Sequence, residues 1–224
     1  MYDNQPITHV IYDLDGLLLD TESLIDRVNA IITGHYGKAV DSSIKSKIAG
    51  RNALESAQIL IDDLELPLTP HDYLQHKDTL IDDIYPQAQP LPGVISLIQH
   101  LHHHKIPQAV ATSSSQRPFS LKTMFHHAWF DLFDCIVTGD DPDIGAGKPA
   151  PDIFLIAAAR MGASPATCLV FEDSLAGVAA ARSAGMSVVA VPDASMDWQR
   201  YQDAHQILSS LTEFKPEHWH LPAQ

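Results

Sequence analysis

Apolar runs and amphipathic segments alternate regularly from residue 94 to residue 191, and this alternation constrains the fold more than any other feature of the sequence. Strands are expected over 108–111, 135–138, 169–171 and 188–191, and helices over 94–104, 118–127, 151–161 and 174–184. Strands that alternate with helices in this way pair in parallel, with helices on both faces of the sheet. The sequence therefore predicts an α/β fold with a Rossmann-like parallel-sheet core.

One more strand is expected near the N-terminus, where an apolar run at 10–12 leads into Asp13, Asp15 and Gly16. Ligands of open α/β sheets bind beyond the carboxyl ends of the strands, and alternate strand residues share a face. Two neighbouring carboxylates repel each other unless a cation or a proton stabilises them, and Mg²⁺ prefers such oxygen ligands. Asp followed by Gly is equally typical of a simple turn.

Residues 20–86 have helical periodicity, with the clearest amphipathic pattern over 53–64, and no strand is expected among them. Pro90-Leu91-Pro92-Gly93 marks the return to the strand–helix alternation. We therefore expect a core formed by 1–19 and 87–224, with a small α-helical cap domain inserted over 20–86.

Composition limits the partners of this 224-residue chain. Its formal net charge of −14 argues against binding to nucleic acid or to an anionic membrane, but not against a small phosphorylated metabolite. No apolar stretch approaches the roughly 20 residues of a membrane span, and no signal peptide is expected at the N-terminus. Cys135 and Cys168 are expected to be buried thiols, as in a reducing cytosol. A cytoplasmic monomer is the expectation.

Three further strand ends carry polar residues. Thr112 and Ser113 follow the strand at 108–111 and could hold phosphate oxygens, although Ser and Thr also cap helices. Lys148 lies between Gly147 and Pro149 and suits a phosphate, or else is an exposed loop lysine. Glu172 and Asp173 follow a buried strand and suit a metal, although Asp173 could also cap the next helix. The order of these signals on successive strand ends indicates one shared site.

With these motifs the chain resembles the haloacid dehalogenase superfamily of phosphohydrolases, in the branch with a helical cap after the first strand. The motifs are Asp13-x-Asp15, Thr112, Lys148 and Glu172-Asp173. Within it the chain is most similar to pseudouridine-5′-phosphatase-like and plant-type glycerol-3-phosphatase-like proteins. That similarity rests on 15–22, 111–114, 139–142 and 171–173.

The resemblance implies that Asp13 attacks phosphorus and forms an aspartyl-phosphate, and that Asp15 protonates the leaving alcohol and then deprotonates water. It implies Mg²⁺ held by Asp13, Asp173 and the backbone carbonyl of Asp15, with Glu172 in support. The remaining phosphate oxygens would be bound by Thr112, the amide of Ser113 and Lys148.

The reaction implied is Mg²⁺-dependent hydrolysis of a small phosphate monoester, such as pseudouridine 5′-phosphate or another sugar or polyol phosphate. The alternative is a sugar phosphomutase of the β-phosphoglucomutase type. Those relatives carry a histidine where this chain has Ile25, which favours the phosphatase. Glu22 and Arg51 are candidate specificity residues. Arg51 lies in a segment, Gly50-Arg51-Asn52, that resembles the cap loop facing the site, but an exposed arginine before a helix is equally compatible.

Overall fold

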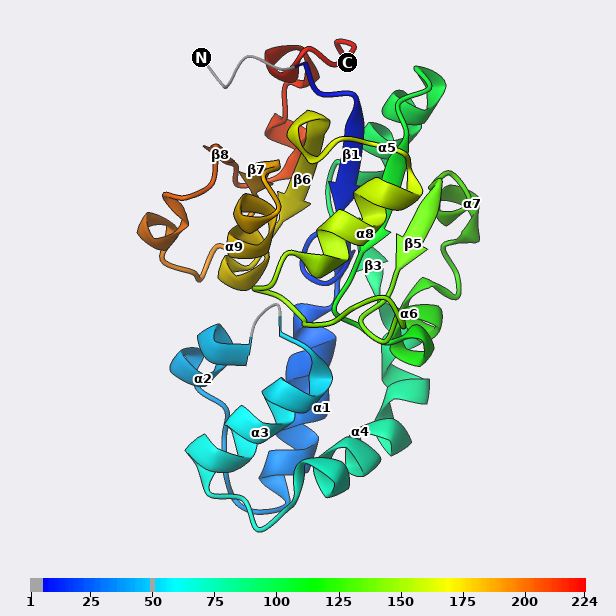
Figure 1. Ribbon diagram of the computed structural model, residues 1–224. Coiled ribbons are helices and arrows are strands. Elements are labelled where there is room, and N and C mark those ends of the chain that lie inside the picture. Colours follow the sequence, from blue (N-terminus) through cyan, green and yellow to red (C-terminus); the bar gives the residue numbers. More distant parts are fainter. Residues whose placement is uncertain (1–5, 49–50) are drawn as a thin grey trace.

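The computed structural model describes residues 6–48 and 51–224, and its centre is a six-stranded sheet (Figure 1). The strand order is β5-β4-β1-β6-β7-β8, and every pairing in this sheet is parallel. The strands are β1 (His9–Tyr12), β4 (Gln108–Ala111), β5 (Cys135–Val137), β6 (Cys168–Glu172), β7 (Ser187–Ala190) and β8 (Gln206–Ile207). The predicted α/β fold with a parallel core is confirmed.

Helices cover both faces of this sheet. Successive strand residues point to opposite faces, so each face presents apolar side chains to the helices that cover it. Val10 and Tyr12 pack with α5 (Val94–His103) and α7 (His127–Phe130), whereas Ile11 packs with α8 (Asp152–Arg160) and α9 (Leu175–Ser183). Strand β1 lies between β4 and β6 and is buried on both faces. The residues that follow β1 are therefore held at the centre of one edge of the sheet.

Residues 21–87 form a separate helical unit, which we call the cap, on the side of the sheet where β1 ends (Figure 1). It consists of α1 (Glu22–Gly34), α2 (Ser42–Ile48), α3 (Ala53–Leu64), α4 (Pro70–Ile84) and the 3₁₀ turn η1 (Tyr85–Gln87). The cap has its own apolar cluster, which includes Val28, Leu60 and Tyr73. A capping box of Thr69 and Asp72 begins α4.

The two connections between core and cap pair with each other. Strand β2 (Leu19–Asp20) and strand β3 (Gln89–Pro90) form a short antiparallel sheet. The expectation of no strand within 20–86 is therefore wrong at Asp20, because the outgoing and returning segments run side by side and satisfy each other's backbone groups. The division at 19/20 and 86/87 stays a proposal.

Two other details differ from the sequence-based expectations. The helix expected over 118–127 is two helices, α6 (Gln116–Thr123) and α7, separated by a turn at 124–126. After β7 the chain adds β8 and the 3₁₀ turns η3 (Trp198–Tyr201), η4 (Leu211–Glu213) and η5 (Pro216–Trp219), which the sequence did not predict. The two cysteine thiols are free, with Cys168 buried. In the described chain, no helix combines the length and the apolar character needed to cross a bilayer.

Candidate active site

The turn after β1 places the two aspartates at the end of the sheet nearest the cap. The Asp13 amide continues the ladder by donating to the Phe171 carbonyl at 3.0 Å. Gly16 has φ +79°, and a Cβ atom there would lie 2.4 Å from Oδ2 of Asp173. Glycine is therefore required twice, for the backbone conformation and for the approach of Asp173. The turn interpretation of Asp15-Gly16 is confirmed, and the site interpretation stays a prediction.

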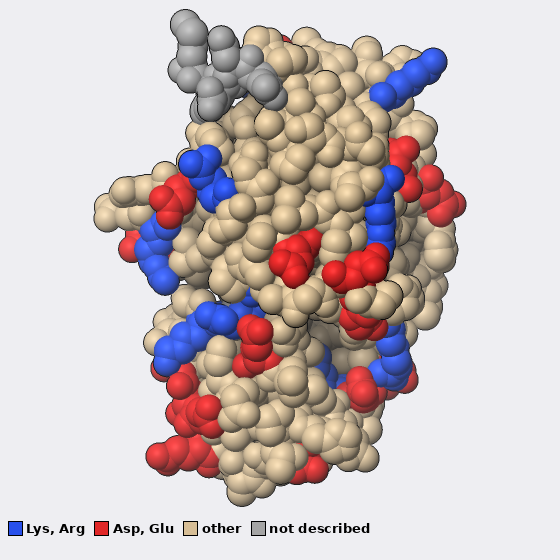
Figure 2. Space-filling model, viewed as in Figure 1, with Lys and Arg blue, Asp and Glu red and all other residues tan. Residues whose placement is uncertain are grey.

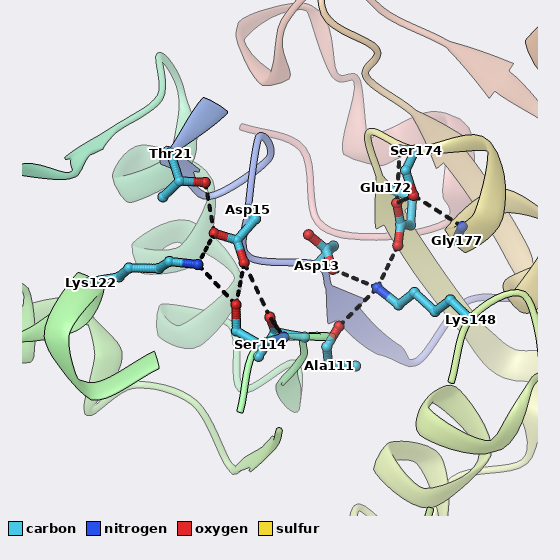
Figure 3. Close-up of polar contacts among 11 residues, drawn as sticks. Asp13, Asp15, Thr21, Ala111, Ser114, Lys122, Lys148, Glu172, Ser174 and Gly177 are labelled. Atoms are coloured by element: carbon cyan, nitrogen blue, oxygen red, sulfur yellow. Dashed lines mark hydrogen bonds and ion pairs between the residues drawn. The ribbon is translucent and has the colours of Figure 1, made fainter. Parts of the chain in front are cut away.

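Lys148 lies beneath the first aspartate with 1% of its surface exposed, so it is not the exposed loop lysine considered from the sequence. Its Nζ donates to Oδ1 of Asp13 at 2.5 Å, to Oε1 of Glu172 at 2.6 Å and to the Ala111 carbonyl at 3.2 Å (Figure 3). Burial lowers the pKa of Lys148, but the two carboxylates outweigh burial and raise it above its ordinary value. Lys148 is therefore a fixed positive charge at the base of the site.

Glu172 supports this lysine and does not face the solvent. Its side chain is fully buried, and its Oε2 accepts hydrogen bonds from the amide and the hydroxyl of Ser174, each at 3.0 Å. A Cβ atom at Gly177 would lie 1.7 Å from Oε1 of Glu172, so α9 approaches the carboxylate closely only because that residue is glycine. Glu172 is thus held between Lys148 and the first turn of α9.

Asp15 is bound by a different set of donors. Its Oδ1 accepts from the Thr21 hydroxyl at 2.7 Å and from Nζ of Lys122 at 2.6 Å, and its Oδ2 accepts from the Ser114 hydroxyl at 2.7 Å (Figure 3). Burial raises the pKa of Asp15, but the Lys122 charge and these hydrogen bonds outweigh it and lower that pKa below its usual value. Asp15 is ionised in this arrangement.

The loop after β4 forms the wall beside the aspartates. The Thr112 amide donates to the Val137 carbonyl at 3.0 Å, and its hydroxyl accepts from the Ser114 amide at 3.0 Å. Gly139 lets the next loop pass close to Ser113, because a Cβ atom there would lie 2.2 Å from the Ser113 carbonyl oxygen. Thr112 is buried, whereas Ser113 and Ser114 face a cavity.

This cavity of about 110 Å³ lies between core and cap. Figure 2 shows the surface hollowed between the two units, with basic and acidic side chains near the rim. Its lining includes Asp13, Asp15, Ser113, Ser114 and Lys122 from the core, and Glu22, Ile25, Asn29, Arg51, Tyr73, Lys77 and Tyr85 from the cap. Five residues named from the sequence therefore line one cavity: Asp13, Asp15, Ser113, Glu22 and Arg51.

The candidate specificity residues differ in their surroundings. Burial and the charges of Asp15 and Asp26 raise the pKa of Glu22 to about 7. Arg51 is half exposed, pairs with Glu55 at 3.3 Å and donates through Nε to the Lys47 carbonyl at 2.8 Å. Gly50, named with Arg51, lies outside the described residues. Both side chains reach the cavity, and their role in specificity stays a prediction.

The acidic residues fit a divalent cation. Burial, together with Glu172 and Asp15, raises the pKa of Asp13 to about 7 despite Lys148. Burial and the charges of Glu172, Asp13 and Glu22 raise the pKa of Asp173 well above its ordinary value. In the described residues, no hydrogen-bond donor or basic side chain contacts the Asp173 carboxylate. A cation between these two carboxylates would relieve their repulsion.

Few groups in the site are available as ligands for a metal ion. In the described part of the chain, no three His, Cys, Asp or Glu side chains form a metal-binding group. The predicted set requires only two carboxylates, those of Asp13 and Asp173, with the backbone carbonyl of Asp15. All three donors are oxygen, which suits Mg²⁺, an ion that usually keeps several water ligands. Asp173 packs against the turn that carries this carbonyl, so the residues present fit the ion.

Sequence reasoning missed Thr21, Ser114 and Lys122 as site residues. Thr21 lies within 15–22, and Ser114 directly follows Thr112 and Ser113, so the sequence could have indicated both residues. Lys122 gave no such signal, because one lysine in a helix is ordinarily a solvated charge.

Comparisons with known proteins identify the family of this chain. The family described as haloacid dehalogenase-like hydrolase matches residues 10–191. The chain is 44% identical over 221 residues to (DL)-glycerol-3-phosphatase 2 of Arabidopsis thaliana, covering 96% of this chain and 92% of that protein. It is 43% identical to the probable pseudouridine-5′-phosphatase of Drosophila melanogaster, covering 97% and 95%.

Among solved structures, β-phosphoglucomutase from Clostridium difficile aligns with a TM-score of 0.78 and 23% identity, over 96% of both chains. At this identity the similarity concerns the fold alone. The two sequence relatives above are phosphatases, which confirms the predicted enzyme class, a phosphoric monoester hydrolase. The chain belongs to the haloacid dehalogenase-like hydrolase family.

Proposed function

We propose that the protein is a Mg²⁺-dependent phosphatase that hydrolyses a small phosphate monoester through an aspartyl-phosphate on Asp13. The observation that carries this proposal is the placement of Asp13. Its carboxylate lines the cavity between core and cap, while Lys148 contacts it from below at 2.5 Å. A carboxylate fixed in this way can attack an ester that enters from the cap side.

The reaction proceeds in two balanced steps. Asp15, which is ionised in the substrate-free site, first takes up a proton from the solvent. In the first step, an Asp13 oxygen bonds to phosphorus, the ester P–O bond breaks, and the leaving oxygen takes that proton from the Asp15 carboxyl group. In the second, a water oxygen bonds to phosphorus and gives a proton to Asp15. The bond between Asp13 and phosphorus then breaks and releases inorganic phosphate. Asp15 thus acts first as acid and then as base.

The remaining site residues would bind the phosphate group and the metal ion. Thr112, the amide of Ser113 and Lys148 would hold the phosphate oxygens that do not react. Asp13, Asp173 and the Asp15 carbonyl would hold the ion, and Glu172 keeps Lys148 in place. When bound, Mg²⁺ neutralises phosphate charge, so that the anionic nucleophile can approach.

The substrate is a small phosphorylated metabolite, with pseudouridine 5′-phosphate or another sugar or polyol phosphate as the proposed class. The names of the two phosphatase relatives support this class. The cap side of the cavity supports it as well, because Asn29, Arg51 and Lys77 line it with polar groups suited to hydroxyl-bearing substrates. Burial and the Lys122 charge lower the pKa of Lys77 to about 8. The proposed location is the cytoplasm, and the proposed state is a monomer.

The test is phosphate release with Mg²⁺ from a panel of sugar, nucleotide and polyol phosphates, with the Asp13→Asn variant in parallel. We expect release by the wild type only, and a transient phosphoryl adduct of the wild-type chain in mass spectrometry. Release by both proteins would exclude Asp13 as the nucleophile. No release from any ester would contradict the proposed function.

The phosphomutase alternative is not favoured by the cavity. Ile25 lines it at the position where the resemblance places the mutase histidine, and an isoleucine side chain cannot transfer a proton. Incubation of a sugar 1-phosphate with a bisphosphate activator would form the 6-phosphate isomer only if the mutase alternative is correct.

A further inference from the structure

The two aspartates of the motif have separate lysine partners. Lys148 contacts Asp13, whereas Lys122, from helix α6, contacts Asp15 at 2.6 Å. We propose that Lys122 is a positioning residue that holds the Asp15 carboxyl group where its proton reaches the leaving oxygen. This inference rests on the proposed phosphatase function and adds a residue to its proton-transfer step.

The contacts around Asp15 explain why a lysine is needed. Asp15 lies beyond the end of β1 and forms only an isolated bridge with Leu19, so no strand or helix fixes its side chain. Thr21 and Ser114 each supply one neutral hydroxyl, to Oδ1 and Oδ2 respectively. Lys122 supplies the charged contact and also donates to the Ser114 hydroxyl at 2.9 Å. Asp15, Ser114 and Lys122 thus form a closed triangle that fixes the plane of the carboxylate (Figure 3).

Lys122 is itself held in place. Its side chain is 3% exposed, unlike Lys45 and Lys47, whose side chains are 43% and 53% exposed. Its Nζ lies 4.7 Å from the centroid of the Tyr85 ring, at the point where the cap returns to the core. A buried ammonium group is costly unless it is paired, so this burial indicates a specific contact with Asp15.

Loss of this positioning has a particular kinetic consequence. An alkyl phosphate releases a strongly basic alkoxide, which needs the proton from Asp15 as the P–O bond breaks. An aryl phosphate such as p-nitrophenyl phosphate releases a weakly basic phenolate, which departs without that proton. Misplacement of Asp15 therefore slows cleavage of the alkyl ester much more than cleavage of the aryl ester. General loss of structure would slow both equally.

The experiment compares Lys122→Met with the wild type on p-nitrophenyl phosphate and on the best alkyl phosphate of the substrate panel, both with Mg²⁺. The ratio kcat/KM is measured because it covers the steps up to the first P–O cleavage. We expect kcat/KM to fall about 100-fold on the alkyl ester and less than about 5-fold on the aryl ester. Lys215→Met, which removes an exposed lysine outside the site, is the matched control.

An equal loss on both esters, or no loss, would overturn the role of Lys122. A wild type inactive on both esters would instead contradict the proposed function, so the two failures are distinguishable. If Lys122→Met does not fold, Tyr85→Leu gives the same comparison, because it leaves Lys122 in place and removes the ring beside it. We expect a smaller loss of about 5-fold on the alkyl ester alone, and an equal loss on both esters would again overturn the inference.

Discussion

The hydroxyl of Thr21 donates to Oδ1 of Asp15 at 2.7 Å, which joins the first connection to the cap directly to the proposed acid and base. Thr21 is fully buried and immediately precedes helix α1. We propose that movement of the cap about this connection changes this contact of Asp15. Substrate entry would then be linked to the proposed proton-transfer group, because a lid that closes over a site also completes it.

Thr21→Val removes this hydrogen bond and keeps the shape of the side chain. We expect kcat to fall about 10-fold with little change in KM, because the contact orients Asp15 and does not bind substrate. The free energy of unfolding should fall by about 1 kcal/mol, which urea titration would measure.

Thr33→Val is the matched control for Thr21→Val, because the Thr33 hydroxyl, at the other end of helix α1, is also buried but has no hydrogen-bond partner in the described residues. This replacement should leave kcat unchanged and leave the free energy of unfolding equal or higher. Equal effects of the two replacements would contradict the role assigned to Thr21.

Lys148→Met should remove activity and destabilise the fold. The variant leaves the buried carboxylates of Asp13 and Glu172 facing each other without a cation, which costs about 3–5 kcal/mol at neutral pH. We expect kcat/KM to fall at least about 100-fold. Arg160→Met breaks two ion pairs at the surface, with Asp141 and Asp143, and should cost about 1 kcal/mol. A similar loss of stability in both variants would contradict the stronger effect expected for the buried ion pairs of Lys148 with Asp13 and Glu172.

Much of the core could be predicted from the sequence because parallel strands are continuous apolar runs. Strand β4 was predicted with its observed limits, and β6 was predicted within one residue at each end. Residues at the ends of such strands meet at one edge of the sheet, which is why Asp13, Thr112 and Glu172 come together as expected. The end of the chain gave no comparable pattern, because the 3₁₀ turns there are too short for a periodic signal.

The donors to Asp15 illustrate the limit of sequence reasoning. The distance between Lys122 and Asp15 depends on how α6 packs beside the cap connection, which involves residues 107 positions apart. No local sequence pattern predicts such a contact. By contrast, Asp13 and Lys148 could be assigned to one site from the sequence. Asp13 follows β1 and Lys148 lies in the loop after β5, and both strands end on the same side of the sheet.

Glu22 makes stability depend on pH. Its folded pKa of about 7 lies above the ordinary value of 4.5, so the folded state holds the proton that the unfolded state has lost. Stability therefore falls as pH rises from 4.5 towards 7, and the loss is complete above that range. Glu22→Gln should be more stable than the wild type by about 3 kcal/mol near pH 8, and the difference should vanish near pH 4. Unfolding is measured by urea titration with a chelator present. A difference that does not vary with pH would contradict this explanation.

Mg²⁺ should raise the thermal midpoint of the wild type, because an ion that binds the folded state alone shifts the equilibrium towards it. The carboxylates of Asp13 and Asp173 repel each other when both are ionised, and the ion offsets that repulsion. Asp173→Asn should be at least as stable as the wild type without Mg²⁺, but should show no increase with it and no phosphatase activity. Asp131→Asn, at an exposed position outside the site, is the control and should keep the full response. The measurement is differential scanning calorimetry across a Mg²⁺ titration. An unchanged response in Asp173→Asn would place the ion elsewhere.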